Sequence, residues 1–310
     1  MIQPQDHRVE GCDRRYAAID IGSNGVRLLL SRVIQSDEYC VFTKESLVRM
    51  PIRLGSDVFR DGEIGDEKAE QLVSTMIAYS HLMAAYRPHD HRACATSAMR
   101  EAKNGEALVQ RIREESGIEL EIISGGLEAE IIMATHAEEQ LEKDRPYLYI
   151  DVGGGSTECT VYSAGKRRAS RSFPLGTVRM LQQAPVEAVW RDLRDWLAEH
   201  TAALEAMSAI GSGGNINKLF RLAGRKAHKP VSRKKLMEVY DELIGYTVDE
   251  RIRILSLRPD RADVIVPACE VFLKTMQWAK CKQIYIPQFG LADGLVRLMH
   301  ARTQDKLPLD

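Results

Sequence analysis

Two stretches of the chain, AAIDIGSNGVRLLL (17–30) and YIDVGGGSTECTVY (149–162), share one pattern: an apolar strand, an aspartate, a glycine-rich turn and a second strand. In this alignment Asp20 corresponds to Asp151. A third apolar stretch with glycines, AIGSGG (209–214), leads into a helical segment. The repeat predicts two duplicated α/β domains that face each other across a cleft, where ligands commonly bind.

The periodicity of the rest of the chain agrees with this organisation. Runs of β-branched and apolar residues predict strands at 16–21, 26–34, 39–50, 91–96, 118–124, 147–152, 157–163, 166–173, 208–211 and 283–287. Apolar residues at three- and four-residue steps predict helices at 66–86, 106–116, 127–141, 186–204, 215–223, 232–244, 262–279 and 291–301. We expect an N-terminal domain at 1–127 and a C-terminal domain at 128–310, with the last helix, 291–303, packing back onto the first domain.

Composition excludes several classes of protein. The 310 residues carry 43 Lys and Arg against 44 Asp and Glu, and this balance argues against a general binder of nucleic acid or membrane surfaces. No apolar run approaches the roughly 18 residues of a membrane span, and the N-terminus lacks the apolar core of a signal peptide. The six cysteines are scattered without a C-x-x-C pair, which predicts reduced thiols and a cytoplasmic protein.

Each repeated hairpin has the chemistry of a phosphate-binding loop. The glycines remove side chains from the turn, so that backbone N–H groups can point at an anion, helped by Ser23, Asn24, Ser156 and Thr157. Two such loops facing each other would hold a phosphate chain from both sides. The alternative interpretation is a pair of ordinary tight hairpins whose glycines adopt positive φ.

Carboxylates beside bound phosphates imply a cation. Asp20, Asp151 and Glu158 would repel a phosphate unless a divalent ion lay between them, and Mg²⁺ prefers such oxygen ligands. The hydroxyl of Ser97 and the guanidinium of Arg100 suit a terminal phosphate, although a helix cap and a surface arginine would give the same pattern.

One further carboxylate, Glu128, follows a strand and a Gly-Gly turn and begins a helix. Its position is compatible with catalysis, but acidic residues also favour the first helical turn because of the helix dipole.

Taken together, these motifs resemble the exopolyphosphatase and guanosine pentaphosphate phosphohydrolase family (Ppx/GppA). The matching stretches are IDIGSNGVRL (19–28), ATSAMREAKN (95–104), IELEIISG (118–125), YIDVGGGSTE (149–158), FPLGTVRM (173–180), AIGSGGNINKL (209–219) and RPDRADVIVPA (258–268). The resemblance implies two ribonuclease-H-like domains of the actin-like ATPase and sugar-kinase group with an inter-domain cleft. This chain is similar to the short, two-domain members.

The resemblance also implies roles for individual residues. Glu128 aligns with the general base that activates water, and Asp151 and Glu158 align with the acidic catalytic pair associated with magnesium. The expected metal ligands are Asp151, Glu158 and Asp20. The expected phosphate-binding residues are Asp20, Gly22, Ser23, Asn24, Arg27, Ser97, Arg100, Gly153, Gly154, Gly155, Ser156, Thr157 and Gly213.

The implied function is the release of terminal phosphate from inorganic polyphosphate by magnesium-assisted attack of a water that Glu128 activates. The alternatives are a guanosine pentaphosphate phosphohydrolase, a kinase of the same fold group, and a non-catalytic nucleotide or alarmone sensor. A homodimer is expected from the resemblance.

The chain departs from the family pattern at several positions. Gly25 replaces a usual serine, Gly126-Leu127 replaces a more polar pair, Glu130 replaces a common arginine, and Ala292 stands where an arginine is customary. These departures leave substrate preference open. Two basic stretches, 166–171 and 221–235, are candidates for a track that holds a polyanionic chain outside the cleft, or are simply solvated surface.

Overall fold

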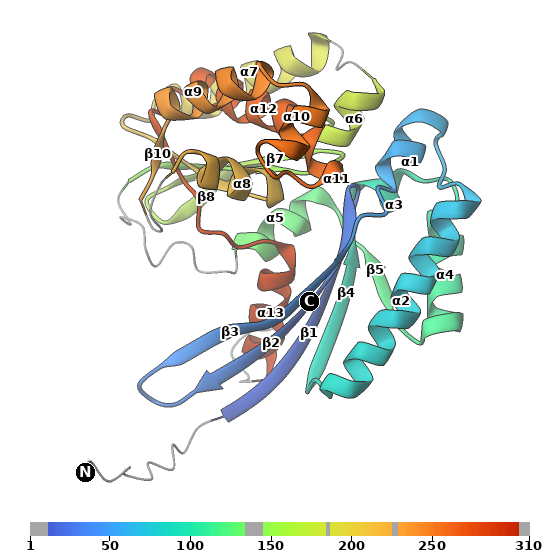
Figure 1. Cartoon of the computed structure of the whole chain (residues 1–310). Helices are drawn as coiled ribbons and strands as arrows, with labels where there is room; N and C mark the ends of the chain where they lie inside the picture. The colour runs from blue at the N-terminus through green and yellow to red at the C-terminus, as the bar shows by residue number, and fades with distance from the viewer. Residues whose placement is uncertain (1–11, 134–144, 184–186, 225–228, 304–310) are drawn as a thin grey trace.

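The computed structural model describes residues 12–133, 145–183, 187–224 and 229–303, and it arranges them in two α/β lobes (Figure 1). Each lobe is built around one mixed sheet, with strand order β3-β2-β1-β4-β5 in the first and β10-β11-β9-β6-β7-β8 in the second. In both sheets a hairpin of the repeat supplies two adjacent strands, β1–β2 and β6–β7. The predicted duplication is therefore visible in the topology.

The first lobe consists of the N-terminal meander followed by parallel strands and helices. Its strands are β1 (Cys12–Gly22), β2 (Gly25–Gln35), β3 (Cys40–Met50), β4 (Asp90–Ala95) and β5 (Leu120–Ile122). Its helices are α1 (Gly55–Asp61), α2 (Asp66–Tyr86), α3 (Ser97–Glu101) and α4 (Gly105–Ser116).

Strand β1 is the centre of the first lobe because both of its faces are buried. Ala17 and Ile19 belong to the core that includes α2 and α4, whereas Tyr16 and Ala18 belong to the core on the opposite face. That opposite face is covered by α5 (Gly125–Met133) and α13 (Leu291–Arg302). The C-terminal helix α13 thus packs on the first sheet, as Figure 1 shows.

The second lobe repeats the plan with more helices on one face. Its strands are β6 (Tyr147–Val152), β7 (Thr157–Ser163), β8 (Lys166–Phe173), β9 (Ser208–Ser212), β10 (Val231–Ser232) and β11 (Gln283–Tyr285). Its helices are α6 (Thr177–Gln182), α7 (Glu187–Thr201), α8 (Gly214–Leu222), α9 (Arg233–Ile244), α10 (Val248–Arg253), α11 (Pro259–Ala262) and α12 (Ile265–Trp278). The apolar faces of α7, α8, α9 and α12 meet the sheet in one large core.

The differences from the predicted elements are local. The strand expected at 118–124 is shorter (Leu120–Ile122), and the helix expected at 127–141 already begins at Gly125, while 134–141 lies outside the described residues. The short helices α1, α3, α6, α10 and α11 were not expected, because four to seven residues are too few to establish a helical period. The expected domain boundary, 127/128, falls inside α5 and stays a prediction. No helix among the described residues combines the length and apolar character needed to span a membrane.

Candidate active site

The two repeated hairpins present equivalent residues at the same end of their sheets. In the β1–β2 ladder Asp20 pairs with Arg27, and in the β6–β7 ladder Asp151 pairs with Glu158. Strands β4 and β9 run parallel to β1 and β6 and end beside them, where Ser97 and Gly213 follow. The carboxyl ends of β1, β4, β6 and β9 therefore open toward the same cleft between the lobes.

Two glycines of the second loop, Gly154 and Gly155, are required by close approach of the opposite lobe. A Cβ on Gly155 would lie 2.1 Å from Ser97 Oγ, and a Cβ on Gly154 would lie 2.9 Å from the Cβ of Ser23 in the opposite lobe. Gly22, Gly25 and 153–155 do not have positive φ, so the interpretation as ordinary hairpins with left-handed glycines does not apply. At Gly213, by contrast, φ is 100°. The two loops are thus pressed against each other, with almost no side chain between them.

The cleft brings together nearly all of the predicted site residues. It has a volume of about 90 Å³. The predicted residues that line it are Asp20, Gly22, Ser23, Asn24, Arg27, Ser97, Glu128, Asp151, Gly153, Gly154, Gly155, Ser156, Glu158 and Gly213. Arg100 and Thr157 are not part of its lining. The hydroxyl of Thr157 donates to the carbonyl of Leu175, and Arg100 Nη1 donates to the carbonyl of Ile123 at 2.6 Å.

Glu128 lies at the start of α5 and faces the other carboxylates of the cleft. Its backbone N–H donates to the carbonyl of Ser124 at 2.9 Å, which fixes the first turn of the helix. Burial, followed by the negative charges of Glu158, Asp151 and Asp20, raises the pKa of Glu128 well above its usual value. The positive charge of Arg100 opposes this rise. A carboxylate with a raised pKa in a polar cleft has the properties of a general base.

Asp151 and the buried Glu158 form an acidic pair on adjacent strands. Ser156 Oγ and Ser172 Oγ donate to Glu158 Oε1 at 2.6 and 2.8 Å, which orients this carboxylate. Burial and the charge of Asp151 nevertheless raise the pKa of Glu158 to about 7. Burial also raises the pKa of Asp151, and a hydrogen bond from Ser212 works against the rise. The negative charge of this pair is therefore not fully compensated by the protein.

The acidic pair fits a magnesium ion that is shared with a substrate. Within the described residues, no three His, Cys, Asp or Glu side chains come together to hold a metal by themselves. Mg²⁺ typically takes one or two carboxylates and completes its octahedron with waters and substrate phosphates. Two oriented carboxylates with raised pKa values match that requirement.

Residues that the sequence did not single out complete the cleft wall. Arg49 Nη2 lies 2.5 Å from Asp260 Oδ2 and donates to the carbonyl of Asn24 at 3.1 Å. Arg261 lines the cleft from the second lobe. The hydroxyl of Thr177 also lines it, as does that of Ser23, which the sequence did predict to bind phosphate. Each is buried without a hydrogen-bond partner in the described part of the chain. Both hydroxyls are therefore free to contact a ligand.

Arg53 also connects the first phosphate loop to the opposite lobe. Its guanidinium donates to Asp263 Oδ2 and Oδ1 at 2.5 and 2.8 Å and to Asn24 Oδ1 at 2.9 Å. Asn24 Nδ2 in turn donates to the carbonyl of Asp260 at 2.9 Å. The amide of Asn24, which was predicted to bind phosphate, is thus engaged in a contact between the lobes.

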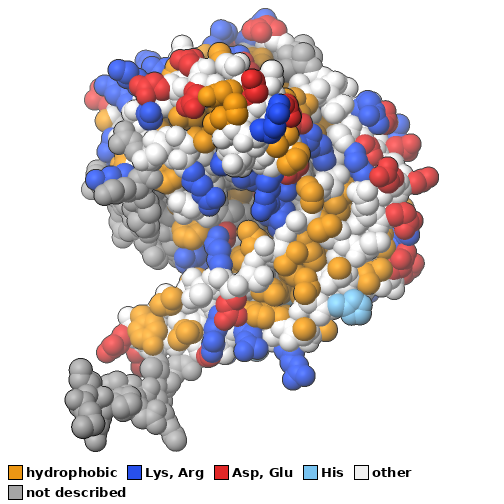
Figure 2. Space-filling model, viewed as in Figure 1, with side chains coloured by type: hydrophobic (Ala, Val, Ile, Leu, Met, Phe, Trp, Pro, Cys, Tyr) orange, Lys and Arg blue, Asp and Glu red, His pale blue; other side chains and the backbone are white. Residues whose placement is uncertain are grey.

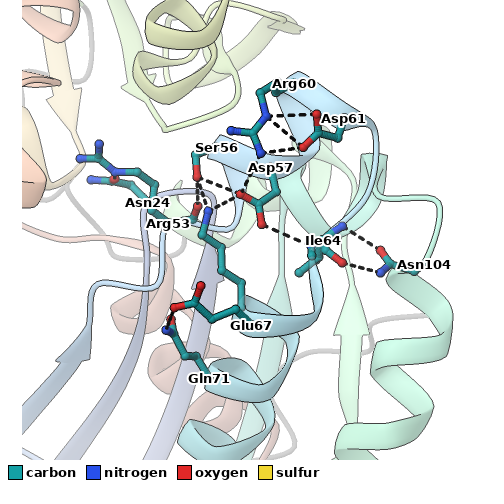
Figure 3. Close-up of polar contacts among 12 residues, drawn as sticks. Asn24, Arg53, Ser56, Asp57, Arg60, Asp61, Ile64, Glu67, Gln71 and Asn104 are labelled. Atoms are coloured by element: carbon teal, nitrogen blue, oxygen red, sulfur yellow. Dashed lines mark hydrogen bonds and ion pairs between the residues drawn. The ribbon is translucent and has the colours of Figure 1, made fainter.

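The segment that carries Arg53 is itself anchored. Figure 3 shows Arg53 between Asn24 and the start of α1, where Ser56 Oγ donates to the carbonyl of Arg53 at 2.9 Å. Asp57 Oδ2 accepts from the backbone N–H of Gly65 at 3.2 Å. These contacts hold Arg53 in place despite its φ of 52°, which an arginine rarely adopts.

The comparison with known proteins identifies the family. Residues 39–302 match the sequence pattern of the Ppx/GppA phosphatase family. This chain belongs to the Ppx/GppA phosphatase family. The match covers most of the chain and confirms the predicted family and, with it, the predicted class of hydrolase.

Curated relatives of this Ppx/GppA member extend over nearly its whole length. It is 26% identical to Exopolyphosphatase 1 of Mycobacterium tuberculosis, with 91% of this chain and 87% of that protein aligned. It is 28% identical to Exopolyphosphatase 2 of the same organism, with 91% of this chain and 97% of that protein aligned.

Solved structures confirm the predicted fold class. The Aquifex aeolicus member of the Ppx/GppA family superposes with a TM-score of 0.73 at 23% identity, over 94% of this chain and 99% of that one. An exopolyphosphatase from Cytophaga hutchinsonii superposes with a TM-score of 0.76 at 22% identity, over 92% of this chain and 97% of that one. At this identity the likeness concerns the fold.

Proposed function

We propose that this protein is an exopolyphosphatase that releases the terminal phosphate of inorganic polyphosphate. The observation that carries the proposal is the closed pairing of two glycine loops with Glu128 facing the acidic pair across the same small cleft. The names of the curated relatives support the same substrate. A site of this kind suits a compact, highly charged anion better than a large organic ligand.

Different residues of the cleft would bind the phosphate and transfer the proton. Backbone N–H groups of the two loops, together with the hydroxyls of Ser23 and Thr177, would bind the terminal phosphoryl group. Glu128 would accept a proton from the attacking water, so that a new P–O bond forms as the bond to the bridging oxygen breaks. The products are inorganic phosphate and a chain that is shorter by one phosphate.

Magnesium is part of the proposal. Held by Asp151 and Glu158, with Asp20 nearby, it would neutralise charge on the phosphate oxygens. The raised pKa values of Asp151 and Glu158 support this assignment, because a bound cation would offset both their burial and the negative charge beside them. Arg27 Nη1 lies 2.5 Å from Asp20 Oδ2, so Asp20 is already partly neutralised and would be the weakest ligand.

We also propose that the protein acts in the cytoplasm as a homodimer. None of the six cysteines, all of which lie in the described residues, forms a disulfide, and this suits a reducing compartment. The edge strand β3 and the turn before it expose Val41 and Tyr39, at 47% and 43% of their surface, on a free sheet edge that a second copy would cover. Analytical ultracentrifugation at micromolar concentration tests the dimer, and a monomer that persists there would contradict it.

Phosphate release from polyphosphates of graded length and from guanosine pentaphosphate, with and without Mg²⁺, tests the function. We expect magnesium-dependent release from inorganic polyphosphate with no added acceptor, which a kinase would not give. Faster release from guanosine pentaphosphate than from any polyphosphate would favour the alternative substrate. Tight binding without turnover in Mg²⁺ would favour a sensor.

A further inference from the structure

A second, larger groove opens directly from the active-site cleft. It has a volume of about 450 Å³, and it shares Asp20, Arg27, Arg49, Arg261 and Gly213, among others, with the cleft wall. One side of the groove is formed by β2 and β3, and the other by α8 and the segments 256–261 and 288–293. Whatever extends from the cleft on this side must therefore enter the groove.

The groove is strongly cationic. Its basic lining residues are Arg27, Lys44, Arg49, Lys218, Arg221, Arg258 and Arg261, and its acidic ones are Asp20 and Asp293. Figure 2 shows Lys and Arg side chains gathered in the hollow between the lobes.

Only some of these cations are neutralised by the protein. Arg27, Arg49 and Lys44 form ion pairs with Asp20, Asp260 and Asp293, respectively. For Lys218, Arg221, Arg258 and Arg261 no ion pair is found within residues 12–133, 145–183, 187–224 and 229–303.

The cations of the groove, paired and unpaired, repel one another. Burial and the charges of Arg221 and Arg261 lower the pKa of Lys218. Burial and the charges of Arg49 and Arg27 lower the pKa of Arg261 to about 10. Like charges held this close destabilise the empty groove, and an anion with several charges would relieve the repulsion.

We propose that the groove holds the inorganic polyphosphate chain behind its terminal phosphates, and that Lys218, Arg221 and Arg258 give the enzyme a preference for long chains. This inference rests on the proposed exopolyphosphatase function. The terminal phosphates occupy the cleft, and the following phosphates pass Arg261 into the groove. Every phosphate of the chain carries charge, so the spaced cations would contact it in any register.

The aromatic content of the groove argues against a nucleoside as its occupant. Phe289 is the sole aromatic residue among the described lining residues. Its ring is approached by Lys44 Nζ, 5.8 Å from the centroid, and by the Arg297 guanidinium carbon, 5.7 Å from the centroid. A base would have to displace these cations in order to stack.

Only the beginning of the basic stretch 221–235, which the sequence analysis identified as a candidate track, lines the groove in the described part of the chain. Arg221 lies in the groove, 225–228 lies outside the described residues, and Lys229, Arg233, Lys234 and Lys235 are not part of the lining. A track would therefore begin at Arg221 and continue backward to Lys218 along α8. The exposed Lys229 and Lys234 supply a control with the same change of net charge.

The experiment compares K218Q/R221Q with K229Q/K234Q, using tripolyphosphate and a long polyphosphate as substrates. Loss of two charge contacts with the chain should raise the KM for long polyphosphate about tenfold more than the KM for tripolyphosphate. The control variant should leave the ratio of the two KM values at that of the wild type. Added salt should raise the long-chain KM less steeply in K218Q/R221Q than in the wild type, because fewer contacts remain to be screened.

Three outcomes would overturn the groove assignment. K218Q/R221Q could raise the KM for tripolyphosphate as much as that for long polyphosphate, or K229Q/K234Q could raise the long-chain KM equally. The third outcome is a rise in the KM of K218Q/R221Q for guanosine pentaphosphate that equals the rise for long polyphosphate. The last would indicate a nucleotide in the groove. If the wild-type protein released no phosphate from either polyphosphate, the proposed function itself would fail. Circular dichroism and thermal unfolding of both variants identify any loss of fold.

Discussion

The guanidinium of Arg49 occupies the space that a side chain at Gly25 would need. A Cβ at position 25 would lie 2.8 Å from Arg49 Nη2 and 3.0 Å from the carbonyl oxygen of Met50. Arg49 uses this space to reach Asp260 in the opposite lobe. The replacement of the family's usual serine by Gly25 is thus coupled to a contact that joins the lobes beside the cleft.

Substitution of Gly25 should act through Arg49. We expect G25S to displace the guanidinium, to weaken its pairing with Asp260 and to raise the KM for polyphosphate about threefold to tenfold. The variant R49Q should give a similar rise. Both changes remove the same contact. The double variant G25S/R49Q should therefore raise the KM for polyphosphate much less than the two single effects combined would. Additive effects on KM would show that Gly25 and Arg49 act separately.

The general base gives the sharpest test of the chemistry. E128Q preserves the size and hydrogen-bonding capacity of the side chain but removes its ability to accept a proton. We expect kcat to fall by about 10²–10⁴, with little change in KM or thermal stability. The matched control is E130Q on the same helix, where Glu130 is exposed and pairs with Arg167. If E128Q retained near-normal phosphate release, another group would have to activate the water.

The Arg53 contact offers a test of how the lobes are held together. Lysine cannot reproduce the forked contact with Asp263 or reach Asn24 and Asp260 at the same time. R53K should therefore loosen the first phosphate loop and raise KM by about threefold to tenfold, more than it lowers kcat. R60K is the control, because Arg60 pairs with the neighbouring Asp61 at the surface, as Figure 3 shows. The same KM for R53K and R60K would mean that Arg53 does not position the loop.

Much of the fold follows from local sequence patterns. Strands 147–152, 157–163 and 166–173 were predicted with the observed bounds, because the turns at 153–156 and 164–165 mark where each strand ends and the next begins. The same patterns located Asp20, Asp151 and the glycine loops. Glu128 was found through its resemblance to a family residue, since an acidic residue in a first helical turn has a simpler explanation.

The residues that sequence reasoning missed depend on contacts between distant segments. Arg49 lies one residue before the end of an edge strand, and Arg261 lies in a helix of four residues, so neither has a local signal for a role in the cleft. Their positions follow from how the lobes meet. Arg100 illustrates the reverse case: its motif predicts phosphate binding, whereas the side chain donates to the carbonyl of Ile123. Its phosphate-binding role stays a prediction.

The acidic pair should make stability depend on pH in an unusual direction. Burial holds the pKa of Glu158 at about 7 in the folded protein, above the usual value of 4.5 that applies when the chain is unfolded. Between these two values the native state binds more protons than the unfolded state, so the free energy of unfolding falls as pH rises. Without metal, we expect the free energy of unfolding to fall by on the order of 2 kcal/mol between about pH 5 and pH 8.

Magnesium should reverse that trend, because it binds the deprotonated pair. Urea unfolding in EDTA should show a lower midpoint at about pH 8 than at about pH 5.5, and millimolar Mg²⁺ should raise the midpoint mainly at the higher pH. The variant E158Q carries no titratable proton at this position, so it should lose the part of both effects that Glu158 contributes, while the raised pKa values of Glu128 and Asp151 maintain the remainder. Equal stabilisation by Mg²⁺ at the two pH values, or an unchanged pH dependence in E158Q, would assign the metal to other ligands.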